Sequence, residues 1–441
     1  MAMTNEPGTL DIDKEVVQIT QNLIRIDSTN FGDDSGPGEA AVAEYVEAAL
    51  KEVGIECERF TTTSSKRQGV FAVIEGADVE LPALLVHGHL DVVPAVGKWQ
   101  HDPFGAEIHD GMVWGRGAVD MKDGNGILLS TVRAWKLAGI KPRRTIHLLF
   151  LPDEEAGGKH GAHWLVDNRK DMFINVTEAV GEVGGFSLEV NKDLRLYFIE
   201  TAEKGIRWMQ LTAQGQAGHG SMLNKNNAVT ELAETLTRIG RFEWPVRLTK
   251  TNESLVKELS KAFNIDLDPT DVPSLIKVLG PMARLIGATF QNSAQPTMLE
   301  AGYKVNVIPE FATAQVDGRV LPGFEEEFDR QIDELLGPNV SRTDTIRDIA
   351  METPFTGYTV DAMAAALRAE DDKAHAVPYV LSGGTDAKAF ARLGIRCYGF
   401  IPLQLPPSLD FAALFHGVDE RVPVDALRFG VRVMDRFLRN A

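Results

Sequence analysis

The chain has 441 residues, a length that exceeds one ordinary hydrophobic core and therefore favours two domains. Its composition, with 44% hydrophobic and 24% charged residues, excludes a mainly disordered protein. The 63 acidic and 45 basic residues give a formal net charge of -18, which excludes nucleic acid and anionic membrane surfaces as expected partners because like charges repel.

The first part of the chain alternates between helix and strand patterns. Apolar residues at helical spacing predict three helices, at 16–26, 39–53 and 125–137. Short apolar runs predict three strands, at 70–74, 83–86 and 146–151. Such alternation is typical of α/β layers, in which helices cover a sheet. We therefore expect an α/β domain.

A second unit begins near residue 205. Strand patterns at 206–212, 302–307 and 313–319 and amphipathic helices at 229–239 and 325–336 predict a two-layer α+β module, with extra helices near 248–295. The α/β alternation then returns, with helices at 360–368 and 424–438 and a strand at 397–401. We therefore expect a discontinuous first domain, 1–204 and 351–441, interrupted by an inserted domain, 205–350.

Cysteine usage and the N-terminus bear on the cellular location. The chain has only two cysteines, Cys57 and Cys397, so no disulfide framework or cysteine-based zinc knuckle is indicated. Residues 1–10 are polar, and no segment approaches the roughly 18 apolar residues of a membrane span. We expect a cytoplasmic protein with no membrane partner.

A histidine and an aspartate follow the strand predicted at 83–86. Because alternate side chains of an extended segment share a face, His89 can point toward a metal ion while Asp91 contacts the far imidazole nitrogen. A lone histidine beside a strand is more often a solvated or core residue. The presence of Asp91 favours the metal-ligand interpretation.

Carboxylates occur at two other chain turns. Asp120 precedes a predicted helix, where it can bridge two cations or simply cap the helix. Glu154 and Glu155 follow the strand predicted at 146–151 and repel one another unless a cation or a proton intervenes, although a solvated acidic loop is the alternative. In the metal interpretation, Glu155 ligates a cation while Glu154 takes a proton from water and passes it to a leaving nitrogen.

Several weaker candidates lie further along the chain. Glu182 and His416 complete a donor set for two divalent cations, although each alone is equally consistent with a surface group. Arg319 can present a planar fork to a substrate carboxylate, but surface ion pairing is commoner for such arginines. His219, Asn306 and Gly384 are candidate substrate contacts for which a flexible surface loop is the alternative.

With these residues assembled, the chain resembles the M20 metallopeptidase family, which contains aminoacylases, glutamate carboxypeptidases, acetylornithine deacetylases and succinyl-diaminopimelate desuccinylases. The resemblance rests on ordered motifs at 89–94, 115–122, 152–157, 181–185, 216–221, 317–323 and 415–420. The helical material at 248–295 looks like the carboxypeptidase S-like branch. A long apolar stretch at 403–414 departs from the family pattern and leaves the substrate open.

The resemblance implies a zinc-peptidase-like three-layer α/β catalytic domain with an inserted two-layer α+β lid and dimerisation domain. It implies two divalent metal ions, zinc or alternatively cobalt or manganese, held by His89, Asp120, Glu155, Glu182 and His416. In this arrangement Asp120 bridges the ions, Glu154 is the general base and Asp91 orients His89. The resemblance also implies a homodimer formed through the lid, oxyanion stabilisation by His219 across the dimer, and substrate binding by Asn306 and Arg319.

We therefore expect hydrolysis of an amide or peptide bond in a small carboxylate-bearing substrate, either an N-acyl amino acid or a short peptide. One alternative is a metal aminopeptidase that recognises a free amine, and Arg319 argues against it because an arginine favours a carboxylate. The other alternative is a non-catalytic peptide-binding protein on the same scaffold, and Glu154 argues against it because pure binding needs no general base.

Overall fold

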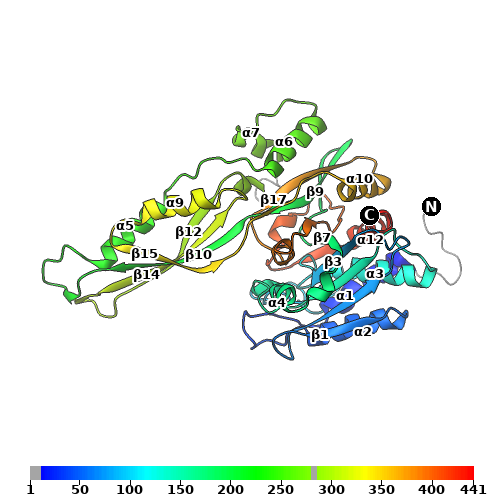
Figure 1. The fold of residues 1–441 in the computed structure, drawn as a ribbon, viewed down its shortest axis with the longest axis horizontal. Helices are drawn as coiled ribbons and strands as arrows, with labels where there is room; N and C mark the ends of the chain where they lie inside the picture. Colours follow the sequence, from blue (N-terminus) through cyan, green and yellow to red (C-terminus); the bar gives the residue numbers. More distant parts are fainter. Residues whose placement is uncertain (1–10, 280–285) are drawn as a thin grey trace.

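A computed structural model describes residues 11–279 and 286–441 and shows two large sheets, with the second extending away from the first (Figure 1). The first is a ten-stranded mixed sheet and the second a four-stranded antiparallel sheet. The N-terminal residues 1–10, on which part of the location prediction rests, lie outside the described residues. No helix within the described ranges combines the length and apolarity needed to cross a bilayer.

The ten-stranded sheet brings several strand ends to one edge. Its spatial order is β1 (Cys57–Thr61), β2 (Gln68–Ile74), β6 (Ile146–Leu151), β3 (Ala83–His89), β7 (Val176–Gly181), β18 (Arg396–Gly399), β9 (Leu194–Glu203) and β16 (Met351–Glu352), with β8 (Ser187–Asn191) and β17 (Ala374–Leu381) also paired to β9. β3 runs parallel to both β6 and β7. The carboxyl ends of these three strands therefore meet, as they do at ligand sites of open α/β sheets.

Both faces of this sheet are covered, which confirms the predicted three layers. β3 is buried along its whole length, and its alternating residues enter different clusters, with Leu84 and Val86 in one and Leu85 in the other. The first cluster includes helices α1 (Ile12–Ile24), α2 (Ala40–Glu52), α3 (Lys122–Ala138), α10 (Tyr358–Glu370) and α12 (Val424–Asn440). The second includes α4 (Ala162–Asn168) and α11 (Ala387–Ala391).

The four-stranded sheet and its helices form the lid. Its strand order is β12 (Ser293–Ala301), β14 (Phe311–Val320), β10 (Gly205–Gln214) and β15 (Val340–Arg347). Helices α5 (Ala228–Gly240) and α9 (Glu325–Leu336) pack on it through Leu232, Phe328 and Ile332, in a cluster separate from the main core. This is the predicted two-layer α+β architecture, whereas the domain boundaries at 204/205 and 350/351 stay predictions.

One predicted lid strand is wrong. Residues 302–306 turn instead, Val307 begins the short strand β13 (Val307–Ile308), and the strand that pairs with β14 is β12, which lies earlier in the chain. Gly302 has a φ of +69°, a left-handed conformation that ends the strand, and Tyr303 and Val305 are exposed. The apolar residues of 302–307 therefore mark an exposed turn, and they do not form a buried face.

Extra helices occur as predicted, but they cover the larger sheet. They are α6 (Lys250–Phe263) and α7 (Val272–Leu279). Leu255, Val256 and Leu259 of α6 belong to the core cluster of the ten-stranded sheet, and α6 contacts β17. The helical prediction extends too far toward residue 295, because β12 begins at Ser293, and residues 280–285 lie outside the described residues.

A small three-stranded sheet supports the loops that lead to the candidate site. Its order is β19 (Arg421–Pro423), β5 (Met112–Trp114) and β4 (Ile108–His109). β5 leads into the loop that ends at Asp120, and β19 follows the loop that contains His416. Segments about three hundred residues apart in the chain are thereby fastened side by side.

Candidate metal centre

Three neighbouring parallel strands each deliver candidate ligands at their carboxyl ends. His89 is the last residue of β3, Glu154 and Glu155 lie in the short helix after β6, and Glu182 directly follows β7. His89 and Glu182 are buried. The buried apolar strands place these polar groups at one sheet edge because their registers are fixed by packing on both faces.

Two histidines and their carboxylate neighbours form a continuous cluster. The Nε2 atom of His89 lies 3.0 Å from Oδ1 of Asp120 and 3.3 Å from Oε2 of Glu182. The Nε2 atom of His416 lies 3.2 Å from Oδ2 of Asp120 and 3.1 Å from Oε2 of Glu155. The two oxygens of Asp120 thus face different histidines, which is the arrangement that a bridging carboxylate requires.

A buried ion pair fixes the loop that carries Asp120. Glu420 accepts hydrogen bonds from the main-chain N–H groups of Gly117, Val119 and Asp120, at 3.0, 2.7 and 3.2 Å. The same carboxylate lies 2.5 Å from Nη1 of Arg116, whose other terminal nitrogen donates to the carbonyl oxygen of Gly417 at 2.9 Å. The pair therefore holds Asp120 and the segment after His416 in a fixed relation.

Asp91 supports the site from behind. The Nδ1 atom of His89 lies 3.0 Å from the main-chain oxygen of Asp91 and 3.6 Å from its carboxylate Oδ1. The carboxylate accepts hydrogen bonds from the main-chain N–H groups of Glu154 and Glu155, at 3.1 and 3.0 Å, and from Asn30 at 2.9 Å. Asp91 thus contacts His89 mainly through its backbone, while its side chain anchors the turn that carries both glutamates.

Burial and mutual repulsion oppose ionisation of the three glutamates, whereas for Asp120 hydrogen bonds from the two histidines outweigh burial and lower its pKa. Burial, followed by the charge of Glu182, raises the pKa of Glu154 well above its usual range. Burial also raises the pKa of Glu155 to about 6 and the pKa of Glu182 to about 7. Hydrogen bonds to Asp120 and Glu155 raise the pKa of His416 to about 10. The carboxylates therefore need nearby positive charge to remain ionised together.

The donor set fits divalent cations. Nitrogen and oxygen donors of His89, Asp120 and Glu155 lie within 4.8 Å of one another, as do those of His89, Glu154 and Glu182. Within the described residues, the buried Oε1 atom of Glu155 has no hydrogen-bond partner. Two imidazoles with several carboxylates suit zinc, cobalt or manganese. A cation would neutralise the excess negative charge of the carboxylates and give this oxygen a ligand partner.

Within the described residues, the predicted substrate-binding side chains form their hydrogen bonds outside this cluster. His219, on the ribbon of β11 (Gly218–His219) and β13 (Val307–Ile308), is exposed and lies 2.8 Å from the Ser221 hydroxyl. Asn306 is exposed in the same ribbon, where its main-chain oxygen accepts from Gly220 at 3.0 Å. Among the described residues, neither forms a hydrogen bond or ion pair with a candidate ligand.

Arg319 and Gly384 occupy the region where the lid meets the ten-stranded sheet. Arg319 makes hydrogen bonds to both carboxylate oxygens of Asp317, at 2.8 and 3.1 Å, so the surface-pairing alternative describes the observed contact. A Cβ atom at Gly384 would lie 2.6 Å from Nζ of the buried Lys388. The glycine therefore leaves room for the lysine, and its role in substrate binding stays a prediction.

Sequence reasoning missed two structural contributors. One is the Arg116–Glu420 pair, whose partners are far apart in the chain. The other is Asp386, a buried residue whose Oδ2 atom lacks a hydrogen-bond partner within the described part of the chain. Burial and the charge of Glu182 raise the pKa of Asp386 well above its usual range, although His89 opposes this effect. The only sequence signal for Asp386 was its position in the glycine turn at 382–386.

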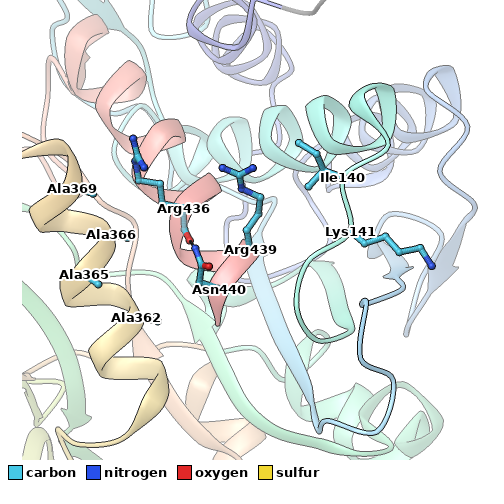
Figure 2. Close-up of a pocket in the computed structure, with 9 residues that line it drawn as sticks. All are labelled: Ile140, Lys141, Ala362, Ala365, Ala366, Ala369, Arg436, Arg439 and Asn440. Carbon is cyan, nitrogen blue, oxygen red and sulfur yellow. Dashed lines mark hydrogen bonds between the residues drawn. The ribbon is translucent and has the colours of Figure 1, made fainter. Parts of the chain in front are cut away.

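A separate hollow of about 500 Å³ lies between α10, α12 and the turn after α3 (Figure 2). It is lined by alanines of α10 and by the side chains of Lys141, Arg436 and Arg439. Each cation has a carboxylate partner, since Lys141 lies 3.2 Å from Glu75, Arg436 lies 2.5 Å from Glu370 and Arg439 lies 3.0 Å from Asp435. None of the candidate ligands lines this hollow, so it is not the candidate site.

The comparisons with known proteins decide the family. The model of peptidase family M20/M25/M40 matches residues 85–440. The chain belongs to this family. Aminoacylase-1 of Sus scrofa is 27% identical over 91% of the chain and 90% of that protein, and the probable carboxypeptidase S-like 2 of Dictyostelium discoideum is 26% identical over 79% and 70%.

Solved structures share the fold. The M20 family metallo-carboxypeptidase Sso-CP2 from Sulfolobus solfataricus has a TM-score of 0.71 and 18% identity, over 97% of this chain and 99% of that one. The YXEP protein of Bacillus subtilis has a TM-score of 0.63 and 13% identity, over 97% and 98%. Together with the family match, these findings confirm the predicted resemblance, the α/β catalytic fold with an inserted α+β domain, and the class of metallopeptidase and amide hydrolase.

Proposed function

We propose that this family member hydrolyses the amide bond of an N-acyl amino acid or short peptide that carries a free carboxylate. The observation that supports the proposal most directly is the cluster in which Asp120 faces both His89 and His416. Aminoacylase-1 and the N-fatty-acyl-amino acid synthase/hydrolase of Mus musculus, which is 27% identical over 391 residues, are named for acylated amino acids. Both names favour this substrate class over a folded protein.

We infer that two divalent cations, with zinc as the first candidate, bind at this cluster. His89 and Glu182 would hold one, His416 and Glu155 the other, and Asp120 would contact both, because each of these histidine-to-carboxylate pairs lies within 3.3 Å. The Bacillus subtilis structure is described as that of a dinuclear metal binding peptidase. When bound, such cations act as Lewis acids toward a carbonyl oxygen and lower the pKa of water.

Glu154 is the proposed general base. Its main-chain N–H is fixed 3.1 Å from Asp91 Oδ1, and a carboxylate oxygen of Glu154 lies within 4.8 Å of donor atoms of His89 and Glu182. From this position the carboxylate accepts a proton from the attacking water and delivers it to the leaving nitrogen, so the product amine departs neutral. Asp91 supports this task by holding the turn that contains Glu154.

We assign substrate recognition to residues of the lid and of the glycine turn at 382–386. Arg319 would bind the substrate carboxylate by exchanging its present partner, Asp317, since a planar guanidinium pairs with carboxylates through two parallel hydrogen bonds. Asn306 and Gly384 would border the bound substrate. His219, which is exposed on the β11/β13 ribbon, would stabilise the developing oxyanion in the active site of a second subunit.

That arrangement requires a homodimer formed through the lid. β12 is an edge strand of the four-stranded sheet, and its second half is exposed. An exposed edge offers unpaired main-chain groups to a second copy of the same strand. Analytical ultracentrifugation should therefore show a dimer, and a monomer under conditions of full activity would remove His219 from the proposed mechanism.

The activity itself is tested with protein reconstituted separately with zinc, cobalt and manganese. Each preparation is incubated with a panel of N-acyl amino acids and dipeptides, and the products are measured by mass spectrometry beside a chelator-treated control. We expect release of the free amino acid only from metal-loaded protein. Binding without turnover across the panel would favour the peptide-binding alternative. Activity that survives amidation of the carboxylate but is lost on acetylation of the amine would favour the aminopeptidase alternative.

A further inference from the structure

A second group of metal-binding side chains lies outside the proposed catalytic cluster. It consists of His101, Glu107 and His109, whose donor atoms lie within 4.8 Å of one another. Glu107 precedes β4, His109 ends β4, and His101 comes from the loop just before them. Because Glu107 and His109 are two residues apart in extended backbone, their side chains share one face of the strand.

The geometry of this group is unusual for surface residues. The imidazole rings of His101 and His109 are stacked, with centroids 3.8 Å apart and an interplanar angle of 11°. Oε2 of Glu107 lies 2.6 Å from Nε2 of His109 and 3.8 Å from Nδ1 of His101. Within the described residues, the ring nitrogens of His101 make no hydrogen bond. One carboxylate oxygen therefore faces both imidazoles but forms a hydrogen bond with only one.

The backbone around the group is well supported. The buried Trp114 packs its ring edge-on against His101, at 4.8 Å between centroids, and its Nε1 donates to the main-chain oxygen of His109 at 3.2 Å. The main-chain N–H of Trp114 donates to the oxygen of Glu107 at 2.9 Å. The side chains remain accessible, with exposed fractions of 26% for His101, 40% for His109 and 55% for Glu107. An ion can therefore enter from solvent without opening the core.

We propose that His101, Glu107 and His109 form a peripheral binding site for one borderline divalent cation such as Zn²⁺, separate from the catalytic cluster. Two imidazole nitrogens and one carboxylate oxygen are donors that such cations prefer, and water completes the coordination. To bind one ion, the exposed imidazole rings would rotate out of their stacked arrangement, so that one nitrogen of each points at the cation. The bound cation fastens the loop that carries His101 to β4, so its binding raises the stability of the three-stranded sheet that supports the Asp120 loop.

The proposal is tested by comparing zinc content between variants. Chelator-treated protein is equilibrated with increasing zinc and the bound metal is measured by plasma mass spectrometry. We expect His109→Ala and Glu107→Gln each to bind one zinc ion fewer per chain than the unmodified protein, while hydrolytic activity is retained. His375→Ala is the matched control, because His375 lies 3.3 Å from Glu258 and, among the described residues, belongs to no group of metal-binding side chains; it should bind the same amount as unmodified protein.

The comparison does not depend on how many ions the catalytic cluster holds, because the difference between variants is measured. Equal zinc content in the unmodified protein and in a folded His109→Ala variant at every zinc concentration would overturn the proposal. A second experiment needs no variant. In crystals soaked with zinc, anomalous diffraction at the zinc edge should place a peak between His101 and His109, and a map with peaks elsewhere only would overturn the proposal equally.

Discussion

The proposed metal centre and the lid residues assigned to substrate differ in how the structure holds their side chains. His89, Asp120 and Glu182 are buried at strand or loop ends, and His89 contacts both carboxylates. Arg319 instead pairs with Asp317 on its own strand, and His219 is exposed and contacts Ser221. One region is organised before any substrate arrives, whereas the other must exchange its contacts.

The two regions should therefore contribute differently to the free energy of ligand binding. The donors of the proposed centre are held by buried strands and the Arg116–Glu420 pair, so ion binding should require little rearrangement. The lid residues must give up local hydrogen bonds before they bind a substrate, and the net gain from each is correspondingly small. Variants in the two regions should therefore differ in the size and the kind of kinetic effect.

The largest effect is expected for His89→Ala. His89 lies within 3.3 Å of both Asp120 and Glu182. Its imidazole belongs to both of the donor groups described above, so its loss removes a ligand from each. Mutation of a residue that supports a metal ligand typically lowers metal affinity by roughly 10–100-fold. Removal of the ligand itself should therefore lower the affinity further. Equilibrium dialysis should show lost metal, and activity should be undetectable. His147→Ala, which removes a half-buried histidine outside the cluster, is the control and should retain metal.

Glu154→Gln separates chemistry from metal binding within the centre. The variant keeps the size of the side chain but cannot accept the proton from water. We expect kcat to fall by about 10²–10⁴-fold with metal content unchanged. Single-turnover rates and metal analysis on the same preparation provide the measurement, with the exposed Glu243→Gln as control. Normal turnover by metal-loaded Glu154→Gln would reject its role as base.

Glu420→Gln tests whether the buried Arg116–Glu420 pair, the clamp on the Asp120 loop, holds the metal ligands in position. The amide cannot accept from all its present donors, and Arg116 would be left without its carboxylate in the interior. We expect metal affinity to fall by roughly 10–100-fold, and kcat at saturating metal to change little. The matched control is Glu178→Gln, which breaks a similar buried pair with Arg144 at 2.8 Å and should lower thermal stability but not metal affinity. Equal metal affinity in both variants would show that the clamp only stabilises the fold.

Sequence patterns predicted the parts of the fold where burial imposes a simple period. The apolar runs before His89 and Glu154 mark β3 and β6 because both strands are buried on both faces. β15 escaped prediction because it is an edge strand whose residues, from Val340 to Arg347, are mostly polar. The strand predicted at 302–307 was wrong because exposed apolar residues in a turn give the same local signal as a strand face.

In the candidate site, the metal-binding residues were predictable from the sequence, but the contacts that hold them in place were not. Donor types at strand ends identified His89, Asp120 and the two glutamates, and the family resemblance supplied their proposed roles. The contacts of Glu420 with the 117–120 loop could not be predicted, because they join segments about three hundred residues apart in the chain and leave no local pattern. The Arg319–Asp317 pair did have a local signal, since residues two apart on a strand share a face.

The smallest effect is expected in the lid, for Arg319→Met. If Arg319 binds the substrate carboxylate after leaving Asp317, its loss should raise KM by about 10-fold for carboxylate substrates, which corresponds to one charge-assisted hydrogen bond. The amidated substrate should show no change in KM. Asp317→Asn provides the reciprocal variant, because it weakens the competing pair and should lower KM for the carboxylate substrate. A KM that rises equally for the acid and the amide would place Arg319 among the residues that shape the lid, and the carboxylate would then be recognised elsewhere.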